Sequence, residues 1–201
     1  YGMTECGPVI SYTPWRQFIP SSSGRTLPSM ECKIADSADP ERIPGEICVR
    51  GENVMRGYFK NPEATEAVID AEGWLHTGDM GTLSDDRTIF IRGRYKTMIL
   101  GANGQNIYPE EIEAKLNNMP YVCESLVVER GKHLIALVYP DYEAMDRDKI
   151  QNEKLPELME QVRADLNKLV APYERIDRIQ LIANEFEKTP KRSIKRYLYN
   201  A

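Results

Sequence analysis

The residues of this chain best suited to chemistry are an acid, a guanidinium and a glycine-rich loop, all between Gly73 and Glu113. Asp79 ends the sequence TGD, which we interpret as a polar turn that holds a carboxylate. Arg94 offers planar donors that can form two parallel hydrogen bonds to one acceptor group. The loop from Gly101 to Gly104 reads GANG, and its glycines let the backbone approach a ligand closely. Together these residues predict a ligand site.

Three local elements are expected to position these groups. Residues 87 to 92 alternate around an apolar centre and predict a strand, and residues 93 to 94 interrupt that pattern. Pro109 suits the first position of a helix, and Glu110 and Glu111 favour the positive end of its dipole. The site therefore lies in a turn, a strand, a short junction, a loop and a helix start.

The remainder of the first half predicts short strands separated by turns. Residues 31 to 35, 46 to 50 and 88 to 92 are strand-like, and glycines and prolines break the segments between them. Asn61 and Pro62 predict the start of a brief helix that continues to residue 69. This spacing favours a small antiparallel β-barrel-like subdomain or a sandwich.

The second half predicts a compact α+β domain, a sheet with packed helices. A helix is expected from 109 to 118, a hairpin from 121 to 129 and 133 to 139, and a strand from 178 to 183. Residues 141 to 152 are charged and predict a solvated helix or loop. An amphipathic helix is predicted by the apolar stripe Leu155, Leu158, Met159, Val162, Leu166, Leu169 and Val170. The predicted fold class of the whole chain is therefore α+β.

Composition narrows the function classes. The 201 residues are 41% hydrophobic and 28% charged, as expected of a soluble globular protein. A net charge of -5 argues against a general nucleic-acid binder. No apolar run approaches the roughly 18 residues of a membrane span, so no transmembrane segment is expected. The four cysteines lack metal or disulfide spacing, which predicts reduced thiols and a cytoplasmic location.

Several motifs in this order resemble one family, the adenylate-forming enzymes, which include acyl-CoA synthetases, amino-acid adenylation domains and luciferases. The resemblance covers essentially the whole chain, and GWLHTGD and GQNIYPEEIE look most like the C-terminal part of a long-chain fatty-acyl-CoA ligase. It implies ATP, Mg²⁺ and CoA as cofactors and a fatty acid or other carboxylic acid as substrate. Besides the segments above, its motifs are YGMTE at Tyr1 to Glu5, GEICVRGENVMRGY at Gly45 to Tyr58, and KTPKRSIKR near the end.

The resemblance also implies roles at the nucleotide. Asp79 can offer two oxygens to the two ribose hydroxyls, and Arg94 can donate to the same sugar or to phosphate. An aromatic face suits a base, a hydroxyl can donate to phosphate, and a hard carboxylate suits Mg²⁺. By resemblance, these last three groups are Tyr1 against adenine, Thr4 near the α-phosphate and Glu5 on the metal.

By resemblance, the chain divides into two parts that move. Residues 1–92 would complete the large ATP-binding domain, and residues 97–201 would form a mobile C-terminal domain. Residues 93–96 would be the hinge, with Lys96 as its pivot. After rotation, the loop from Gly101 to Gly104 would line the path of the CoA thiol during the second half-reaction.

The sequence departs from the family pattern near its end. The family has a lysine just before the last I-x-R, where it stabilises charge during adenylation, and this chain has Ser193 there. Lys188, Lys191 and Lys195 flank that position. We assign the catalytic role to Lys195. The alternatives are that Lys188 or Lys191 acts instead, that this subgroup stabilises the charge in a different way, and that the segment is a basic tail that covers a surface.

A second departure concerns completeness. The family's phosphate loop lies far upstream of YGMTE, so we expect a missing N-terminal part of the same chain and no activity from these residues alone. The predicted reaction of the parent is acid plus ATP to acyl-AMP and pyrophosphate, then acyl-CoA and AMP. An acyl-AMP ligase that loads a carrier protein and a non-catalytic module that retains the fold remain as alternatives.

Overall fold

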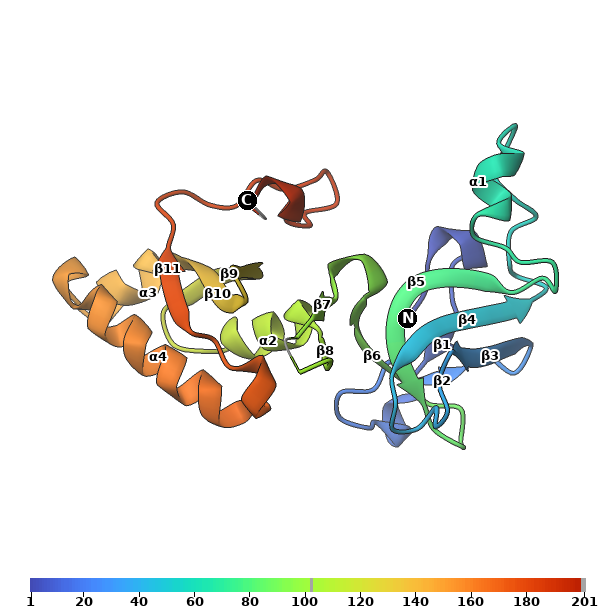
Figure 1. The fold of residues 1–201 in the computed structure, drawn as a ribbon, viewed down its shortest axis with the longest axis horizontal. Coiled ribbons are helices and arrows are strands. Elements are labelled where there is room, and N and C mark those ends of the chain that lie inside the picture. The colour runs from blue at the N-terminus through green and yellow to red at the C-terminus, as the bar shows by residue number, and fades with distance from the viewer. Residues whose placement is uncertain (102, 200–201) are drawn as a thin grey trace. The chain divides into compact units, whose positions relative to one another are not determined.

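The computed structural model describes residues 1–101 and 103–199 and divides the chain into two compact units, Tyr1–Lys96 and Thr97–Ala201 (Figure 1). Both units mix strands and helices, so the predicted α+β fold class is confirmed. None of the helices in these described ranges is long and apolar enough to cross a membrane. Short 3₁₀ segments occur at Thr4–Cys6, Trp15–Gln17, Tyr95–Thr97, Asn152–Lys154, Pro172–Glu174 and Arg196–Leu198.

The N-terminal unit is built on an open antiparallel sheet of four strands in the order β3-β4-β5-β6. These strands are β3 (Met30–Ala35), β4 (Gly45–Gly51), β5 (Leu75–Leu83) and β6 (Ile89–Arg94). A separate antiparallel pair contains β1 (Ser11–Tyr12) and β2 (Arg25–Thr26). A single bridge between Arg25 and Thr88 links β2 to the residue before β6. Among the described residues the four-stranded sheet stays open, so the expected barrel-like arrangement does not close into a barrel.

A single apolar cluster stabilises this unit. Its buried members come from the first residues of the chain and from all four strands of the sheet: Cys6, Ile10, Met30, Ile34, Ile47, Val49, Leu75 and Ile89. The predicted short helix is α1 (Pro62–Glu66), in which Asn61 Oδ1 caps the Ala64 N–H at 3.1 Å. This helix ends at Glu66, three residues before the predicted end.

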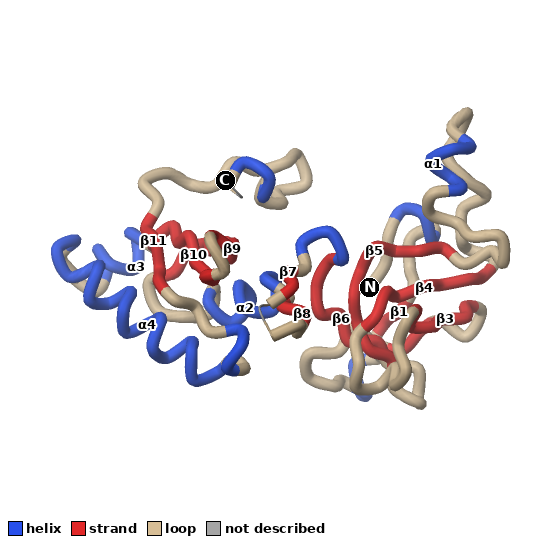
Figure 2. The backbone as a smooth tube through the Cα atoms, in the orientation of Figure 1, coloured by secondary structure: helices blue, strands red, loops and turns tan. Residues whose placement is uncertain are grey.

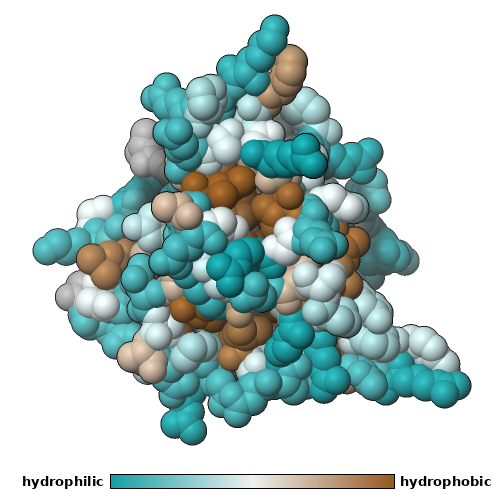
Figure 3. Space-filling view, turned by 90° about the vertical axis from the view of Figure 1, so that its right-hand side faces the viewer, coloured by the Kyte–Doolittle hydropathy of each residue, from teal (hydrophilic) through white to brown (hydrophobic). Residues whose placement is uncertain are grey.

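Burial of apolar side chains within the N-terminal unit is incomplete. The face of this unit in Figure 3 has apolar side chains near its centre and polar ones around them. In this unit, Trp15, Phe18 and Phe59 are 82%, 72% and 89% exposed. Single exposed apolar side chains are common on protein surfaces, so these three residues by themselves do not define an interface.

The TGD segment is part of a strand, which corrects the prediction of a turn. Cys48 of β4 pairs with His76, whereas Glu46 pairs with Met80, so a bulge places residues 77 to 79 opposite a single residue of β4. Gly78 has a φ of +72°, a conformation that glycine adopts without steric penalty. The local distortion explains why the segment has the composition of a turn although it continues the curved β5 (Figure 1).

The junction after the predicted strand is also strand. β6 continues through Gly93 to Arg94, which pairs directly with Asp79. Met80 pairs with Gly93 and Gly81 with Ile91, so Arg92 is an extra residue in the ladder. That extra residue breaks the period-two alternation of side chains. The strand predicted from the alternation therefore stops at residue 92, two residues too early.

The C-terminal unit is a three-stranded sheet with helices on one face (Figure 2). The order is β11-β10-β9, with β9 antiparallel and β11 parallel to β10. Its elements are β7 (Ile99–Leu100), β8 (Asn106–Ile107), α2 (Pro109–Leu116), β9 (Val122–Arg130), β10 (His133–Pro140), α3 (Tyr142–Arg147), α4 (Leu155–Leu169) and β11 (Arg178–Leu181). The predicted hairpin is confirmed, and Gly131 and Lys132 both have positive φ, as a type I′ turn requires.

Alternation along the two hairpin strands separates two apolar layers. One face packs on the helices and includes Val127, Ala136 and Val138. The other face contains Leu126, Val128, Ile135 and Leu137 and is covered by Phe186, with Ile194 and Tyr199 packed against the cluster. The final segment of the chain is therefore fixed to the sheet by apolar contacts.

The helix predictions for this unit are mostly correct. α2 begins at Pro109 with Glu110 and Glu111 in its first turn, and it ends two residues before the predicted end. Of the predicted stripe, Leu155, Met159, Val162 and Leu166 are buried in α4, whereas Leu158 is half-buried and Leu169 is 60% exposed. The segment 141 to 152 contains a helix, α3, whose other residues are exposed, but its Ala144 and Met145 are buried and Met145 lies in the core, so the prediction of a solvated segment is wrong for these two residues.

Candidate functional site

The carboxylate of Asp79 is the centre of a polar cluster in the N-terminal unit. The Asp79 residue is 7% exposed, and its Oδ2 accepts a 2.6 Å hydrogen bond from the hydroxyl of Tyr1. Its Oδ1 lies 2.7 Å from Nε of Arg94, the residue that faces it across the β5–β6 ladder. Burial, followed by the hydrogen bond to Asp79, raises the pKa of the Tyr1 hydroxyl, so this hydroxyl stays a donor.

Both Asp79 oxygens can still accept further bonds. Each carboxylate oxygen has two lone pairs, so the observed partners leave capacity for a pair of ligand hydroxyls. The Arg94 side chain is 60% exposed, which keeps its donors close to solvent. The structure therefore brings Tyr1, Asp79 and Arg94 into direct contact, although residues 1 and 79 are far apart in sequence.

The backbone that carries Asp79 is held by two neighbours that the sequence analysis did not single out. The Thr77 hydroxyl donates to the carbonyl of Ile47 at 2.8 Å and accepts the Asp79 N–H at 3.1 Å. The Gly78 N–H donates to Oε1 of Glu46 at 3.0 Å. A glutamate beside a bulge cannot be assigned this role from pattern alone, because the assignment depends on the register of β4 and β5.

Two sequence motifs meet at Glu5. This residue lies in the 3₁₀ turn at Thr4–Cys6, and its Oε1 accepts a 2.9 Å hydrogen bond from the hydroxyl of Tyr58. The Met55 N–H donates to the Glu5 carbonyl at 2.7 Å, so the end of GEICVRGENVMRGY holds YGMTE in place. Thr4 is exposed beside it. A half-buried carboxylate with remaining lone pairs fits a hard cation such as Mg²⁺.

The first residues of the chain also border an open hollow. Its volume is about 540 Å³, and it is lined by Tyr1, Gly2, Met3, Thr4, Pro8, Val9, Ser11 and Tyr12. Two of the predicted nucleotide-contacting residues, Tyr1 and Thr4, therefore share one surface depression. Such concave surfaces are the ordinary setting for small-molecule binding.

The loop predicted to line a thiol path lies in the C-terminal unit. Its residue 102 lies outside the described residues. Gly104 has a φ of +78°, and a Cβ placed there would meet no atom within 4 Å. The Gly101 N–H donates to the carbonyl of Gln105 at 2.8 Å, which closes the turn. The loop borders a hollow of about 260 Å³ lined by Ile99, Gly101, Asn103, Ile107, Glu129, Lys132, Leu134, Tyr173, Arg175 and Asp177.

Lys195 forms an ion pair in the C-terminal unit. The side-chain Nζ of Lys195 lies 3.2 Å from Oε2 of Glu187. The backbone N–H of Lys195 donates to the backbone carbonyl of Glu187 at 2.8 Å. The preceding residues form a tight turn, in which Thr189 N–H donates to the carbonyl of Ser193 at 2.8 Å and Arg192 has a φ of +62°. Ser193 is exposed at this turn, whereas Lys195 is half-buried.

The same segment is fixed to α2 by an ion pair that the sequence analysis missed. Nη2 of Arg196 contacts Oε2 of Glu113 and lies 3.5 Å from Oε1 of Glu110. Oε1 of Glu113 also accepts the Val127 N–H at 2.7 Å. Burial raises the pKa of Glu113, and Arg196 opposes that shift. The only signal in the sequence was the cluster of acids in PEEIE, which predicted a helix start and no partner.

Comparisons with known proteins define the class. Among solved structures, O-succinylbenzoate coenzyme A synthetase from Bacillus subtilis in complex with AMP superimposes with a TM-score of 0.78 and 28% identity. The match covers all of this chain and 40% of that one. It gives the chain the fold of the corresponding part of an adenylate-forming enzyme.

Family models make the assignment specific. The AMP-binding enzyme model matches residues 1–59, and the model of the AMP-binding enzyme C-terminal domain matches residues 96–201. The chain belongs to the AMP-binding enzyme family. The predicted resemblance to adenylate-forming enzymes is thereby confirmed.

Two plant enzymes illustrate the relationship. A 4-coumarate-CoA ligase from Narcissus pseudonarcissus is 37% identical over 98% of this chain. A 4-coumarate-CoA ligase from Glycine max is 34% identical over 98% of this chain, and the match covers 68% of the Glycine max sequence. This chain spans about a third (35%) of the Narcissus enzyme. Both relatives are CoA ligases, and their names give 4-coumarate rather than a fatty acid.

Proposed function

We propose that the protein containing this chain is an ATP-dependent acid–CoA ligase, which forms an acyl-AMP and then transfers the acyl group to CoA. The single observation that carries the proposal is the contact of Asp79 with both Tyr1 and Arg94. This contact brings together the two carboxylate oxygens of Asp79, the aromatic ring of Tyr1 and the guanidinium of Arg94. Binding of a ribonucleotide needs groups of these three kinds. Membership of the AMP-binding enzyme family supports this use of the cluster.

The proposed nucleotide roles belong to residues of the N-terminal unit. Asp79 accepts the ribose hydroxyls, and Arg94 donates to the sugar or to phosphate. The ring of Tyr1 lies against adenine, with its orientation fixed by the hydrogen bond from its hydroxyl to Asp79. Thr4 donates to the α-phosphate. Glu5 would hold Mg²⁺, which would neutralise phosphate charge when bound.

The C-terminal unit supplies the remaining roles. Lys195 leaves Glu187 and stabilises charge that develops on the α-phosphate during adenylation. The loop from Gly101 to Gly104 lines the path of the CoA thiol in the second half-reaction. Residues 93–96 form the hinge between the large domain (1–92) and the mobile domain (97–201), with Lys96 as its pivot.

Two classes of acid are candidates for the substrate. The motif wording predicts a long-chain fatty acid, whereas both plant relatives carry 4-coumarate in their names. ATP–pyrophosphate exchange on the full-length protein separates them, with acids from acetate to palmitate and 4-coumarate. We expect exchange with one class and thioester formation when CoA is added. A thioester formed only on a carrier protein would identify an acyl-AMP ligase instead.

The role of Asp79 is tested in the same assay. Asp79→Ala is expected to raise the KM for ATP by at least about tenfold, because each lost charge-assisted hydrogen bond contributes roughly 1.5–3 kcal/mol. Asp85→Ala is the matched control, since Asp85 is an exposed acid of the same unit. Equal ATP kinetics for the two variants would remove Asp79 from the nucleotide site.

One observation favours a second candidate. Ser193 stands at the family's lysine position, and Lys195 is already paired with Glu187. If a folded full-length protein shows no exchange with any acid, we infer a non-catalytic binding module that retains the fold. Restored exchange in Ser193→Lys would then identify the lost group.

A further inference from the structure

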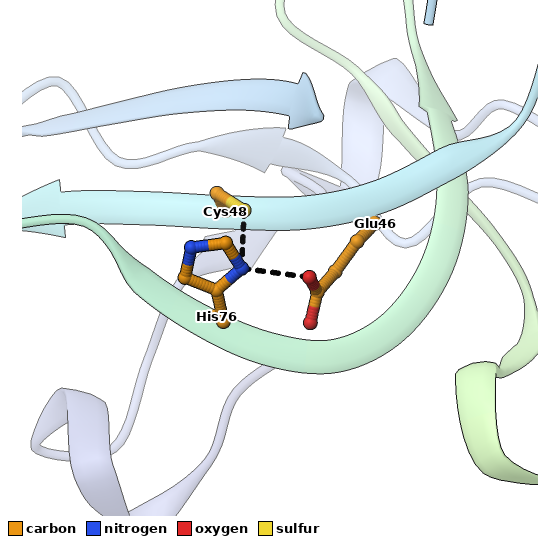
Figure 4. A group of neighbouring side chains, drawn as sticks. All are labelled: Glu46, Cys48 and His76. Atoms are coloured by element: carbon orange, nitrogen blue, oxygen red, sulfur yellow. Dashed lines mark hydrogen bonds and ion pairs between the residues drawn. The ribbon is translucent and has the colours of Figure 1, made fainter. Parts of the chain in front are cut away.

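Three side chains with different metal-binding atoms meet on neighbouring strands of the N-terminal sheet (Figure 4). Glu46 and Cys48 come from β4, and His76 comes from β5, where it pairs directly with Cys48. Nδ1 of His76 lies 3.5 Å from Sγ of Cys48 and 2.7 Å from Oε2 of Glu46. All three ligand atoms lie within 4.8 Å of one another. A pair of hydrogen-bonded strands is a rigid support for such a group.

The three groups differ in their burial. Cys48 is completely buried, whereas the side chains of Glu46 and His76 are 25% and 36% exposed. An ion would therefore approach past the carboxylate and the imidazole and meet the sulfur last. The thiol proton would leave to solvent when the sulfur binds, because only the thiolate is a strong metal ligand. Nδ1 of His76 would likewise release to solvent the proton that it donates to Glu46, and the ring would keep its proton on Nε2, which faces Asp70.

The outer contacts orient two of the three groups. Nε2 of His76 faces Oδ2 of Asp70 at 3.6 Å, so the second ring nitrogen has a carboxylate neighbour. Carboxylate–histidine pairs of this kind fix the tautomer and ring orientation of metal-binding histidines. Oε1 of Glu46 is held by the Gly78 N–H at 3.0 Å, which leaves Oε2 directed at the imidazole.

The separations suit a tetrahedral ion. With Zn–S near 2.3 Å and Zn–N near 2.0 Å, tetrahedral angles put sulfur and nitrogen about 3.5 Å apart. That is the observed distance between Cys48 Sγ and His76 Nδ1. The distance between Oε2 of Glu46 and Nδ1 of His76 would have to increase from 2.7 Å to about 3.3 Å. A small rotamer change of the partly exposed Glu46 side chain is sufficient for this.

We propose that Glu46, Cys48 and His76 form a binding site for Zn²⁺ or a similar borderline-soft dication, with a fourth position open to solvent. The ligand set is one carboxylate oxygen, one thiolate sulfur and one imidazole nitrogen. This site is chemically different from the all-oxygen setting of Glu5, which suits Mg²⁺. It does not depend on nucleotide binding or on the proposed reaction.

Cobalt titration tests the proposal, because Co²⁺ replaces Zn²⁺ and thiolate ligation produces a near-ultraviolet charge-transfer band. The reduced 201-residue chain, without a histidine tag, is expected to bind one equivalent and to show that band. Excess Zn²⁺ should remove the band. Cys48→Ser should abolish it, and Asp70→Asn should weaken binding by about 10- to 100-fold.

Cys123→Ser is the matched control, since Cys123 is an exposed free thiol in the other unit. The control variant should bind as the parent does. If Cys48→Ser fails to fold, as judged by circular dichroism, His76→Gln and Glu46→Gln provide the same test from the partly exposed ligands. Absence of the band in the parent, its persistence in Cys48→Ser or in His76→Gln, or its loss in Cys123→Ser would overturn the proposal.

Discussion

At the scale of single residues, the contact between Arg196 and Glu113 links the end of the chain to α2. Glu113 is 8% exposed, and Arg196 supplies the cation that contacts it. Burial raises the pKa of Glu113, while the positive charge of Arg196 acts in the opposite direction. Removal of the arginine therefore leaves a carboxyl group that must stay protonated or ionise without a cation.

We predict that Arg196→Met lowers the free energy of unfolding of the C-terminal unit by about 3 kcal/mol at pH 8, because it leaves a buried charge unpaired. A folded-state pKa above the unfolded value means that stability is lost as pH rises through the folded pKa. The loss should therefore be smaller at pH 5, where Glu113 can take up a proton. Urea denaturation at the two pH values measures the difference.

Lys191→Met is the control for this variant, because Lys191 is exposed in the same segment. It should change the free energy of unfolding by less than about 0.5 kcal/mol at either pH. A loss in Arg196→Met that is identical at pH 5 and pH 8 would show that the carboxyl of Glu113 is not coupled to the arginine.

Residue types predicted part of the candidate site. Asp79 and Arg94 were singled out as a carboxylate and a guanidinium, and the structure pairs them. Tyr1 was assigned to adenine only by resemblance, and its hydrogen bond to Asp79 could not be foreseen. Contacts between residues so distant in sequence depend on strand register, which short-range pattern does not contain.

At the scale of elements, the apolar stripe of α4 shows what hydrophobic periodicity predicts correctly and what it does not. The period of 3.6 predicted the helix, and the structure buries Leu166 completely in the core beneath the sheet. Leu169 belongs to the same stripe but is 60% exposed in the last turn. Val170, the next residue of the stripe, is again buried in this core, so Leu169 lies at the edge of the buried face.

The two leucines of α4 give a matched pair of variants. Leu166→Ala should destabilise the C-terminal unit by about 3 kcal/mol, from lost transfer free energy and the cavity left behind. Leu169→Ala should change stability by less than about 0.5 kcal/mol. Both tryptophans, Trp15 and Trp74, lie in the other unit, so far-ultraviolet circular dichroism during urea unfolding is the suitable probe. Equal losses for the two variants would contradict the burial of this stripe.

The errors at this scale have a common cause in β-bulges. The bulge opposite Ile47 gave TGD the composition of a turn, and the extra residue Arg92 interrupted the alternation before Gly93. Both segments are strand. Asp79 lies within the first bulge, and Arg94 lies two residues after the extra residue of the second. A bulge redirects side chains without ending the ladder, so periodicity underestimates strand length near a functional site.

At the scale of the whole molecule, the division into two units falls at Lys96 and Thr97. The expected hinge at 93–96 rested on resemblance alone. Residues 93 and 94 belong to β6, and Lys96 lies in the 3₁₀ segment Tyr95–Thr97 between β6 and β7. A short irregular segment between two compact units is the kind of element that absorbs a large change in φ and ψ.

Lys96→Pro in the full-length protein tests whether this segment works as a hinge in the proposed two-step reaction. Proline fixes φ near −65° and restricts Tyr95 as well, so it should hold the segment in one conformation. We expect pyrophosphate exchange to stay within about twofold of the parent and thioester formation to fall by at least about tenfold, because only the second step requires rotation. Lys96→Ala removes the side chain but keeps the backbone freedom, and it should retain both steps. If proline impaired both half-reactions equally, or if alanine impaired thioester formation as much as proline, the fixed φ would not be the cause and the hinge would have to lie elsewhere.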